Sequence, residues 1–313
     1  MHKTSLIYLA LTSVALLWGT SFAAAKIGMY ELSPINLVIF RFIIASLVFA
    51  GILTTMDRNN TIERKDIPKF IILGFLAITS YFCIQYTGLT YTTTINAALI
   101  IATSPISTAL MGAAFGWEKI SASSYTGILL AFAGVSLIIT NGQLTGLFQL
   151  TTLRGDFMLM VNALVWAGFT LYGKNILQKY RPFTAMAYIH ILGTIMLLPL
   201  AFIPTELTPL PFIQQVMTIS WSTAGTALYL AILCSVYGYY MWYTGVGHIG
   251  PVRTAVFSYL NPLFAIITGI WLLGERLTPY TIGGGIMVIA GVYLTNKFKQ
   301  SEPNHAKHTL RSN

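Results

Sequence analysis

The sequence contains 313 residues, of which 55% are hydrophobic and 9% are charged, with a formal net charge of +9 at pH 7. Soluble domains carry about 25% charged residues, so this composition excludes a soluble globular protein and indicates a polytopic membrane protein. The basic residues lie in short segments between apolar runs, which excludes a nucleic-acid-binding domain and makes them a signal of membrane topology instead.

Ten apolar segments of the sequence have the length of a membrane-spanning helix, which is about 20 residues. The predicted helices are about 5–28, 34–56, 69–89, 93–115, 121–140, 156–177, 183–203, 221–245, 251–273 and 279–297. The uncharged run 4–25 exceeds the roughly 7–15 residues of a secretion-signal core, so we expect it to be the first span. The polar segment 141–154 divides the chain into halves.

The two halves repeat each other in sequence. Near the start of each half the matches lie 148 residues apart: Trp18/Trp166, Lys26/Lys174 and Pro34/Pro182. Further on they lie 157 residues apart: Tyr86/Tyr243, Gly88/Gly245, Pro105/Pro262, Glu118/Glu275, Ser121/Thr278, Gly127/Gly284 and Gly134/Gly291. We therefore predict two five-helix repeats, 1–147 and 148–298, followed by a disordered cytoplasmic tail, 299–313.

The distribution of lysine and arginine predicts the orientation. Because five is odd, the second repeat enters the membrane from the side opposite to the first. With both termini inside, 13 of the 18 basic residues fall on the inner side, and Arg154 and Arg276 fall on outer loops. The positive-inside rule then places both termini in the cytoplasm. The expected fold is an all-α polytopic membrane protein with ten transmembrane helices in two inverted-topology five-helix repeats.

Pro105 and Pro262 interrupt two apolar spans at equivalent positions and are predicted helix kinks. A proline inside a helix frees the carbonyl four residues before it, here that of Ile101 or Ser258. In lipid, such a carbonyl is tolerated only against protein or a water-filled cavity. We therefore expect both prolines to flank a central cavity.

Polar and aromatic side chains at mid-membrane depth are the candidates for substrate binding in that cavity, because such residues face protein or a cavity there. They are Trp18, Ser21, Tyr81, Gln85, Ser104, Trp166, Tyr237, Tyr240 and Asn261. A tryptophan at this depth also needs a hydrogen-bond partner for its N–H. The alternative for each residue is ordinary helix packing, and for Ser104 and Asn261 it is bonding to the loosened backbone.

The intramembrane charge is carried by Lys26, Arg41, Lys174 and, if protonated, His190. Lys26 and Lys174 lie near helix ends, where long basic side chains can extend to the headgroups. His190 has the alternative of a packed histidine bonded to a backbone carbonyl. All nine acids fall in loops, helix ends or the tail, so no carboxylate is expected at mid-membrane.

Small residues mark one face of the fifth and tenth predicted helices, which lets membrane helices approach closely. These residues are Gly127, Ala131, Gly134, Gly284, Val288 and Gly291. We predict that these two helices pack together. Glu118 and Glu275 precede Ser121 and Thr278, which are predicted helix caps, so both glutamates are interpreted as helix-end structure.

A set of short motifs occurs in a fixed order along both halves. The motifs are Leu17-Trp18-Gly19-Thr20-Ser21-Phe22, Arg41-Phe42, Thr87-Gly88-Leu89, Pro105 to Glu118, and Asn261-Pro262 to Gly274-Glu275-Arg276. In these residues the chain resembles the EamA-type branch of the drug/metabolite transporter superfamily. The resemblance implies ten helices, cytoplasmic termini, a central cavity lined by helices 1, 3, 4, 6, 8 and 9, and often export of amino acids or other metabolites.

The sequence therefore predicts a secondary transporter of the cell (plasma) membrane that exports small metabolites such as amino acids, or related zwitterions or anions, by alternating access. The alternatives are a non-transporting sensor or assembly protein on the same fold, and multidrug efflux. No enzyme or metal-binding motif occurs in the sequence, so we expect no enzyme, no cofactor and no metal site. The expected partners are a small-molecule substrate and the lipid bilayer, with no nucleic acid. The sequence leaves a coupling ion and the oligomeric state open.

Overall fold

The computed structural model describes residues 2–55, 61–116, 122–142, 151–249 and 251–297, and no β-strand lies among them. Eight helical segments are long and apolar enough to cross a membrane: Ser5–Gly28, Pro34–Thr55, Arg64–Tyr91, Thr94–Ala114, Leu153–Lys174, Pro182–Phe202, Trp221–Ile249 and Thr254–Leu273. Two shorter apolar helices are Tyr125–Thr140 and Pro279–Thr295. The all-helical, multi-pass class is confirmed. The expected Glu118 and Ser121 cap and the tail 299–313 lie outside the described residues.

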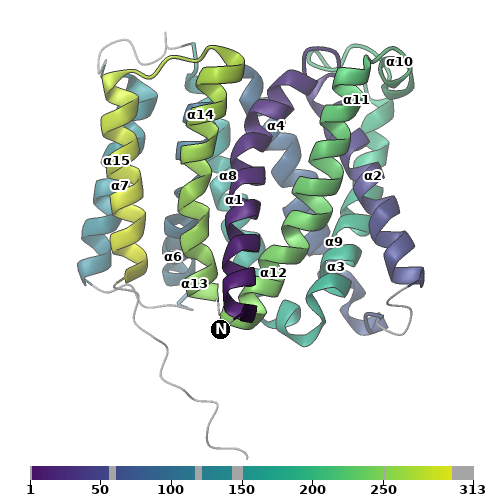
Figure 1. The fold of residues 1–313 in the computed structure, drawn as a ribbon, viewed down its shortest axis with the longest axis horizontal. Helices are drawn as coiled ribbons and strands as arrows, with labels where there is room; N and C mark the ends of the chain where they lie inside the picture. The colour runs from purple at the N-terminus through teal and green to yellow at the C-terminus, as the bar shows by residue number, and fades with distance from the viewer. Residues whose placement is uncertain (1, 56–60, 117–121, 143–150, 250, 298–313) are drawn as a thin grey trace, which may run out of the picture.

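The spans are built from shorter helical elements. In chain order these are α1 (His2–Gly28), α2 (Pro34–Thr55), η1 (Arg64–Asp66), α3 (Ile67–Gly74), η2 (Phe75–Ser80), α4 (Tyr81–Tyr91), α5 (Thr94–Ile101), α6 (Ser104–Ala114), α7 (Ala122–Thr140), α8 (Leu153–Lys179), α9 (Pro182–Leu197), η4 (Leu198–Phe202), α10 (Phe212–Val216), α11 (Trp221–Leu228), η5 (Tyr229–Tyr237), α12 (Gly238–Ile249), α13 (Pro251–Val256), η6 (Phe257–Leu260), α14 (Asn261–Leu273) and α15 (Pro279–Lys297). In Figure 1, α1 begins and α15 ends at the lower end of the bundle.

Two spans contain a π-helical segment, which the sequence analysis missed. These segments are η2 in the third span and η5 in the span that begins at Trp221. They lie at corresponding positions of the two predicted repeats. A π-helical turn leaves one residue out of the regular α-helical register, and such turns are frequent at functional sites.

The two prolines begin new helical segments instead of bending continuous helices. Pro105 lies in the first turn of α6 and Pro262 in the first turn of α14, where a missing N–H costs little. The Ile101 carbonyl, which the proline was expected to free, accepts a hydrogen bond of 2.6 Å from the Ser104 hydroxyl. The Ser258 carbonyl accepts from the backbone N–H of Asn261.

The helix packing has a paired pattern. α1 packs against α12 and α14, and α8 packs against α4 and α6. In the same way α2 contacts η5, and α9 contacts η2. If α1 is exchanged for α8, α2 for α9, η2 for η5, α4 for α12 and α6 for α14, each of these contacts becomes another one in the same set. The contact of α2 with α9 is unchanged by this exchange, and so is that of α7 with α15 if these two helices are exchanged for each other.

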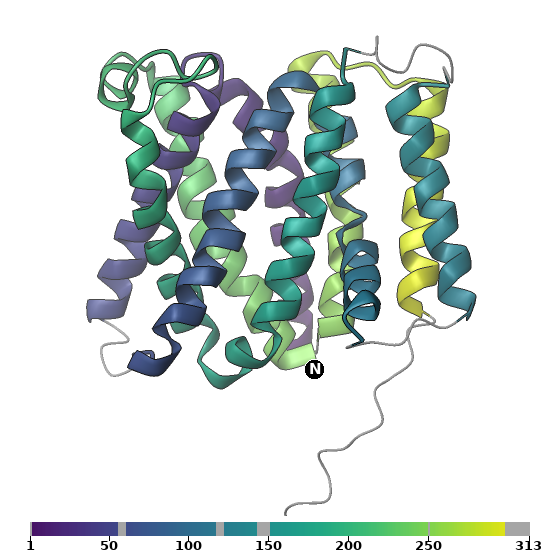
Figure 2. The same cartoon turned by 180° about the vertical axis from the view of Figure 1, so that it is seen from behind.

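Helices α7 and α15 stand together at one end of the bundle in both side views (Figures 1 and 2). A Cβ atom added at Gly127 would lie 2.6 Å from the carbonyl oxygen of Gly291. One added at Gly134 would lie 2.6 Å from that of Gly284. The predicted packing of these two helices on their small residues is confirmed.

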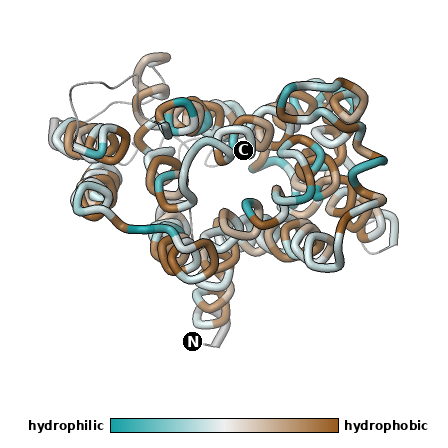
Figure 3. Tube along the Cα trace, turned by 90° about the horizontal axis from the view of Figure 1, so that it is seen from above, coloured by the Kyte–Doolittle hydropathy of each residue, from teal (hydrophilic) through white to brown (hydrophobic). Residues whose placement is uncertain are grey.

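The outside of the bundle is apolar as well as its core. Figure 3 shows the helices nearly end-on, with hydrophobic stretches along most of them. Large side chains such as Phe75, Leu129 and Ile286 are exposed, while the interior holds one extended cluster of buried apolar residues. Exposed apolar faces on long helices are expected where lipid is the solvent.

Candidate functional site

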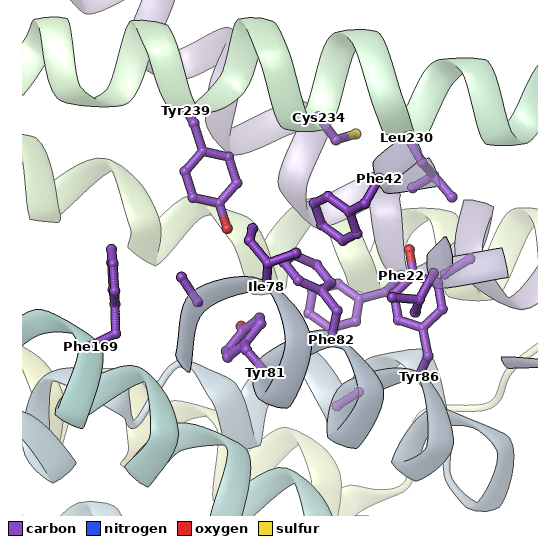
Figure 4. Packing of buried hydrophobic residues seen from close by; sticks show 14 of the residues in the cluster. Phe22, Phe42, Ile78, Tyr81, Phe82, Tyr86, Phe169, Leu230, Cys234 and Tyr239 are labelled. Atoms are coloured by element: carbon purple, nitrogen blue, oxygen red, sulfur yellow. The ribbon is translucent and has the colours of Figure 1, made fainter. Parts of the chain in front are cut away.

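Arg41 makes two side-chain hydrogen bonds within the buried core. Its Nε donates to the Ser235 hydroxyl at 3.0 Å, and its Nη1 donates to the Tyr86 hydroxyl at 2.8 Å. The guanidinium also lies 4.6 Å from the ring centre of Phe82 and 5.0 Å from that of Phe42. We call these five residues the Arg41 cluster. Figure 4 shows Phe42, Phe82 and Tyr86 together in the core, close to η5.

The local structure of η5 orients one member of this cluster. The Ser235 hydroxyl donates to the Leu230 carbonyl, five residues earlier, at 3.1 Å. Five residues is the π-helical spacing. The same oxygen accepts the hydrogen bond from Arg41, so Ser235 donates once and accepts once. Arg41 itself is only 3% exposed, and no carboxylate among the described residues lies within ion-pair distance of it.

Trp18 also contacts η5. Its Nε1 donates to the Cys234 carbonyl at 2.9 Å, which supplies the partner expected for a tryptophan at this depth. Its ring centre lies 5.4 Å from that of Tyr239 and 5.1 Å from that of Trp242. Trp18 therefore joins α1 to η5 and α12.

Trp166 contacts other aromatic rings than Trp18 does. Its ring centre lies 5.2 Å from that of Tyr81 and 5.1 Å from that of Phe169. Gln85, one turn beyond Tyr81 on α4, is also buried. The structure thus brings Tyr81 and Trp166 together, but it pairs Trp18 with a different set of rings.

The hydroxyl groups of two candidates donate to backbone carbonyls three residues earlier in the chain. Ser104 donates to the Ile101 carbonyl at 2.6 Å, and Ser21 donates to the Trp18 carbonyl at 2.6 Å. The structure of Ser104 therefore agrees with the alternative interpretation, in which its hydroxyl bonds to the loosened backbone. Asn261 differs, because its side-chain oxygen is buried without a hydrogen-bond partner among the described residues.

Tyr237 and Tyr240 do not meet at one place. The Tyr237 hydroxyl shares a hydrogen bond of 2.9 Å with the Ser13 hydroxyl on α1. Tyr240 is 39% exposed, and its ring centre lies 5.8 Å from that of Phe183 on α9. Tyr237 therefore contacts α1, whereas Tyr240 contacts α9.

His190 is fully buried beside the Arg41 cluster. Its Nδ1 lies 2.8 Å from the Met186 carbonyl, as in the alternative of a packed histidine bonded to its own helix. Its ring centre lies 5.7 Å from Phe42 and 5.0 Å from Tyr239. Its Nε2 has no hydrogen-bond partner among the described residues.

Lys26 does not extend toward the headgroups, contrary to one of our interpretations. Its Nζ donates to the Thr92 carbonyl at 2.6 Å and lies 3.5 Å from a Glu275 carboxylate oxygen. Glu275 also accepts from the backbone N–H groups of Thr94 and Ile95, at 2.7 and 3.1 Å, and from the Thr94 hydroxyl at 2.9 Å. We call these five residues the outer clamp, because they lie at the end that the predicted topology makes the outer one.

The outer clamp joins segments that are far apart in the sequence. It links the end of α1, the start of α5 and the α14–α15 connection at the upper end of the bundle in Figure 1. Glu275 thus caps α5, whereas the sequence analysis assigned it to the end of its own helix. Thr92 also donates to the buried Asp156 at the start of α8. By contrast, Lys174 is exposed on α8.

Two buried polar residues, Ser235 and Asn162, were missed by sequence reasoning. Ser235 was overlooked because it lies in an apolar run and its role depends on the π-helical register of η5. Asn162 is fully buried on α8, and neither side-chain atom has a partner among the described residues. Its position one turn before Trp166 was the available signal. Among the described residues, no group of three or more metal-ligating side chains occurs.

These features define a class of protein: a multi-pass helical membrane protein with a buried cationic and aromatic core. The EamA-like transporter family model matches residues 5–140 and 153–297. The chain therefore belongs to the EamA-like transporter family.

Relatives cover nearly the whole chain. An "Uncharacterized transporter" of Archaeoglobus fulgidus is 36% identical over 94% of this chain and 98% of its own. A "Probable amino-acid metabolite efflux pump" of Salmonella typhimurium is 26% identical over 90% of this chain and 91% of its own. A solved structure described only as "Crystal structure of protein" aligns with a TM-score of 0.64 at 16% identity, over 94% of this chain and 98% of that chain, which shows the fold alone.

Proposed function

We propose that this protein is a secondary transporter of the cell membrane that exports small metabolites, such as amino acids or related zwitterions or anions, by alternating access. Membership in a transporter family supports the general class. The substrate class is supported by the relative named "Probable amino-acid metabolite efflux pump" and by one named "Probable terminal-alkyne amino-acid exporter". The excess of lysine and arginine on the inner segments favours cytoplasmic termini.

The observation that carries the proposal is the paired packing of the two halves. Contacts of α1, α2 and η2 have counterparts in contacts of α8, α9 and η5. The two family matches, 5–140 and 153–297, also fall on the two halves. This pattern favours ten spans in two inverted repeats, 1–147 and 148–298. Two such repeats can rock against each other, which exposes a site between them to one side at a time.

The outer clamp fits the closed side of such a cycle. Lys26 and the start of α5 belong to the first repeat, whereas Glu275 belongs to the second. Their hydrogen bonds and ion pair therefore cross between the proposed repeats at the outer end. Opening that end requires these contacts to break, so we assign the clamp to the state in which the outer side is closed.

Uptake into inside-out vesicles from cells that produce the protein tests this function. We expect saturable uptake of several labelled amino acids, above that of vesicles from cells without the protein. Trp18→Ala should reduce this uptake, because Trp18 joins α1 to η5 and α12. Trp221→Ala is the matched control, because Trp221 is 94% exposed on the outside of the bundle.

Two results would contradict the proposal in different ways. Absence of saturable uptake for every amino acid and organic acid tested would refute metabolite transport. Saturable uptake of quaternary amines, with no effect of amino acids, would instead favour multidrug efflux.

A further inference from the structure

The Arg41 cluster contains a buried cation without a buried anion. We propose that Arg41 binds the carboxylate of the transported substrate and makes the protein select carboxylate-bearing metabolites. This inference rests on the proposed transport function and names the residue that would decide its substrate class.

The first argument is electrostatic. Arg41 is 3% exposed, and its hydrogen-bond partners among the described residues, Ser235 and Tyr86, are neutral hydroxyl groups. Charged side chains inside a membrane protein normally pair with an opposite charge or line a substrate path, because an unpaired buried charge is unfavourable. Since the described residues supply no carboxylate at this position, a bound substrate is the natural source of the missing anion.

The second argument concerns the geometry of the guanidinium group. It has five N–H donors in one plane, and the two hydrogen bonds to Ser235 and Tyr86 use two of them. Three donors remain, and a carboxylate can accept two parallel hydrogen bonds from such a fork. The rings of Phe42 and Phe82 pack against the guanidinium and restrict its orientation. The cluster therefore holds the charge in place and leaves donors available.

The third argument comes from comparing the two halves. By the repeat spacing of 148 residues, Arg41 corresponds to Ile189, and by the spacing of 157, Ser235 corresponds to Ile78. Both isoleucines are buried. The equivalence is supported by ring pairs: Phe42 and Phe82 lie 4.7 Å apart, and their counterparts, His190 and Tyr239, lie 5.0 Å apart.

This asymmetry separates a substrate role from a purely structural one. A polar link that helix packing required would be expected at both symmetry-related places, yet the positions that correspond to Arg41 and Ser235, Ile189 in the second half and Ile78 in the first, are apolar. The charge is thus a property of one half added to a shared packing arrangement. A substrate has no two-fold symmetry of its own, so a site for it is where the halves should differ.

The position of the cluster explains how a substrate reaches a buried arginine. Arg41 and Tyr86 lie on α2 and α4 of the first proposed repeat, whereas Ser235 lies on η5 of the second. Rocking of the repeats would separate Arg41 from Ser235 and keep Arg41 with Tyr86. The Nε–H of Arg41, which donates to Ser235 in this conformation, would then be free to donate to the substrate carboxylate.

The test compares amino acids with their amides in proteoliposomes containing the purified full-length protein. Leucine and phenylalanine are the probes, each beside the C-terminal amide that lacks the carboxylate. We expect the wild type to transport each acid at least about tenfold better than its amide, in terms of kcat/KM. Arg41→Gln should raise the KM for the acids at least about tenfold and leave transport of the amides unchanged. Arg41→Lys should be intermediate, because lysine keeps the charge without the planar fork.

Arg64→Gln is the matched control, since Arg64 is exposed at the inner end, in η1. It should retain the wild-type preference. If folded Arg41→Gln protein still prefers the acids by the wild-type factor, the inference is wrong and the transport function stands. If Arg41→Gln does not fold, competition on the wild type decides: amides that inhibit leucine transport as well as acids do overturn the inference. A wild type that transports none of the four probes contradicts both proposals.

Discussion

Removal of the Glu275 carboxylate should open the outer end of the protein. Glu275 accepts three hydrogen bonds from Thr94 and Ile95, and its side chain is 8% exposed. A hydrogen bond contributes about 1 kcal/mol net, so three give about 3 kcal/mol. The partly exposed Lys26 adds little, because ion pairs that reach solvent are worth at most about 1 kcal/mol.

Glu275→Ala should therefore shift the balance between outer-closed and outer-open states. Three kcal/mol corresponds to a change of about 100-fold in an equilibrium constant. The shift requires that the bonds be lost when the outer end opens, which follows if Glu275 and α5 move with different repeats. Water that enters the opened site can then solvate the freed N–H groups.

A thiol-accessibility assay measures this shift. Ala97→Cys places a thiol one turn into α5, at a fully buried position, in a Cys83→Ala/Cys234→Ala background. A membrane-impermeant thiol reagent added from outside should label this cysteine about 100-fold faster in Glu275→Ala protein. Glu206→Ala, in an exposed outer segment, is the matched control and should leave the rate unchanged. Equal labelling rates in folded Glu275→Ala and control protein would refute the reasoning.

Three further predictions concern stability. Gly134→Leu should destabilise the protein by about 1–3 kcal/mol, because its Cβ would meet the backbone of α15, whereas Gly51→Leu, with open space around it, should cost little in a thermal unfolding assay. Trp18→Phe should cost about 1 kcal/mol through loss of its hydrogen bond to η5, and an unchanged unfolding midpoint would contradict that interhelical role. The hydrogen bond from Lys179 holds the pKa of Glu63 below its usual value. Its contribution should therefore be present above about pH 4.3 and be lost as the pH falls through the lowered pKa, with a smaller acid-induced loss in Glu63→Gln.

The sequence by itself determined the membrane class, the approximate spans and the packing of α7 against α15. These follow from local properties. A run of about 20 apolar residues is a spanning helix wherever it lies in the fold. Small residues at helical spacing likewise mark a close-packing face without knowledge of the partner. The repeat of Trp18 in Trp166 and of Pro105 in Pro262 was visible for the same reason, and the inverted arrangement drawn from it stays a prediction.

Only the tertiary structure decided which polar groups meet. Lys26 and Glu275 form one contact because α1 and the α14–α15 connection end at the same level, which no local pattern encodes. Arg41 meets Ser235 because the π-helical turn of η5 shifts the helix register by a residue, and its sequence gives no clear signal of that turn. Which side chains meet across helices depends on the rotation, tilt and register of the helices together. The hydropathy of the sequence therefore located the charged residues, whereas the packing of the helices determined which groups they contact.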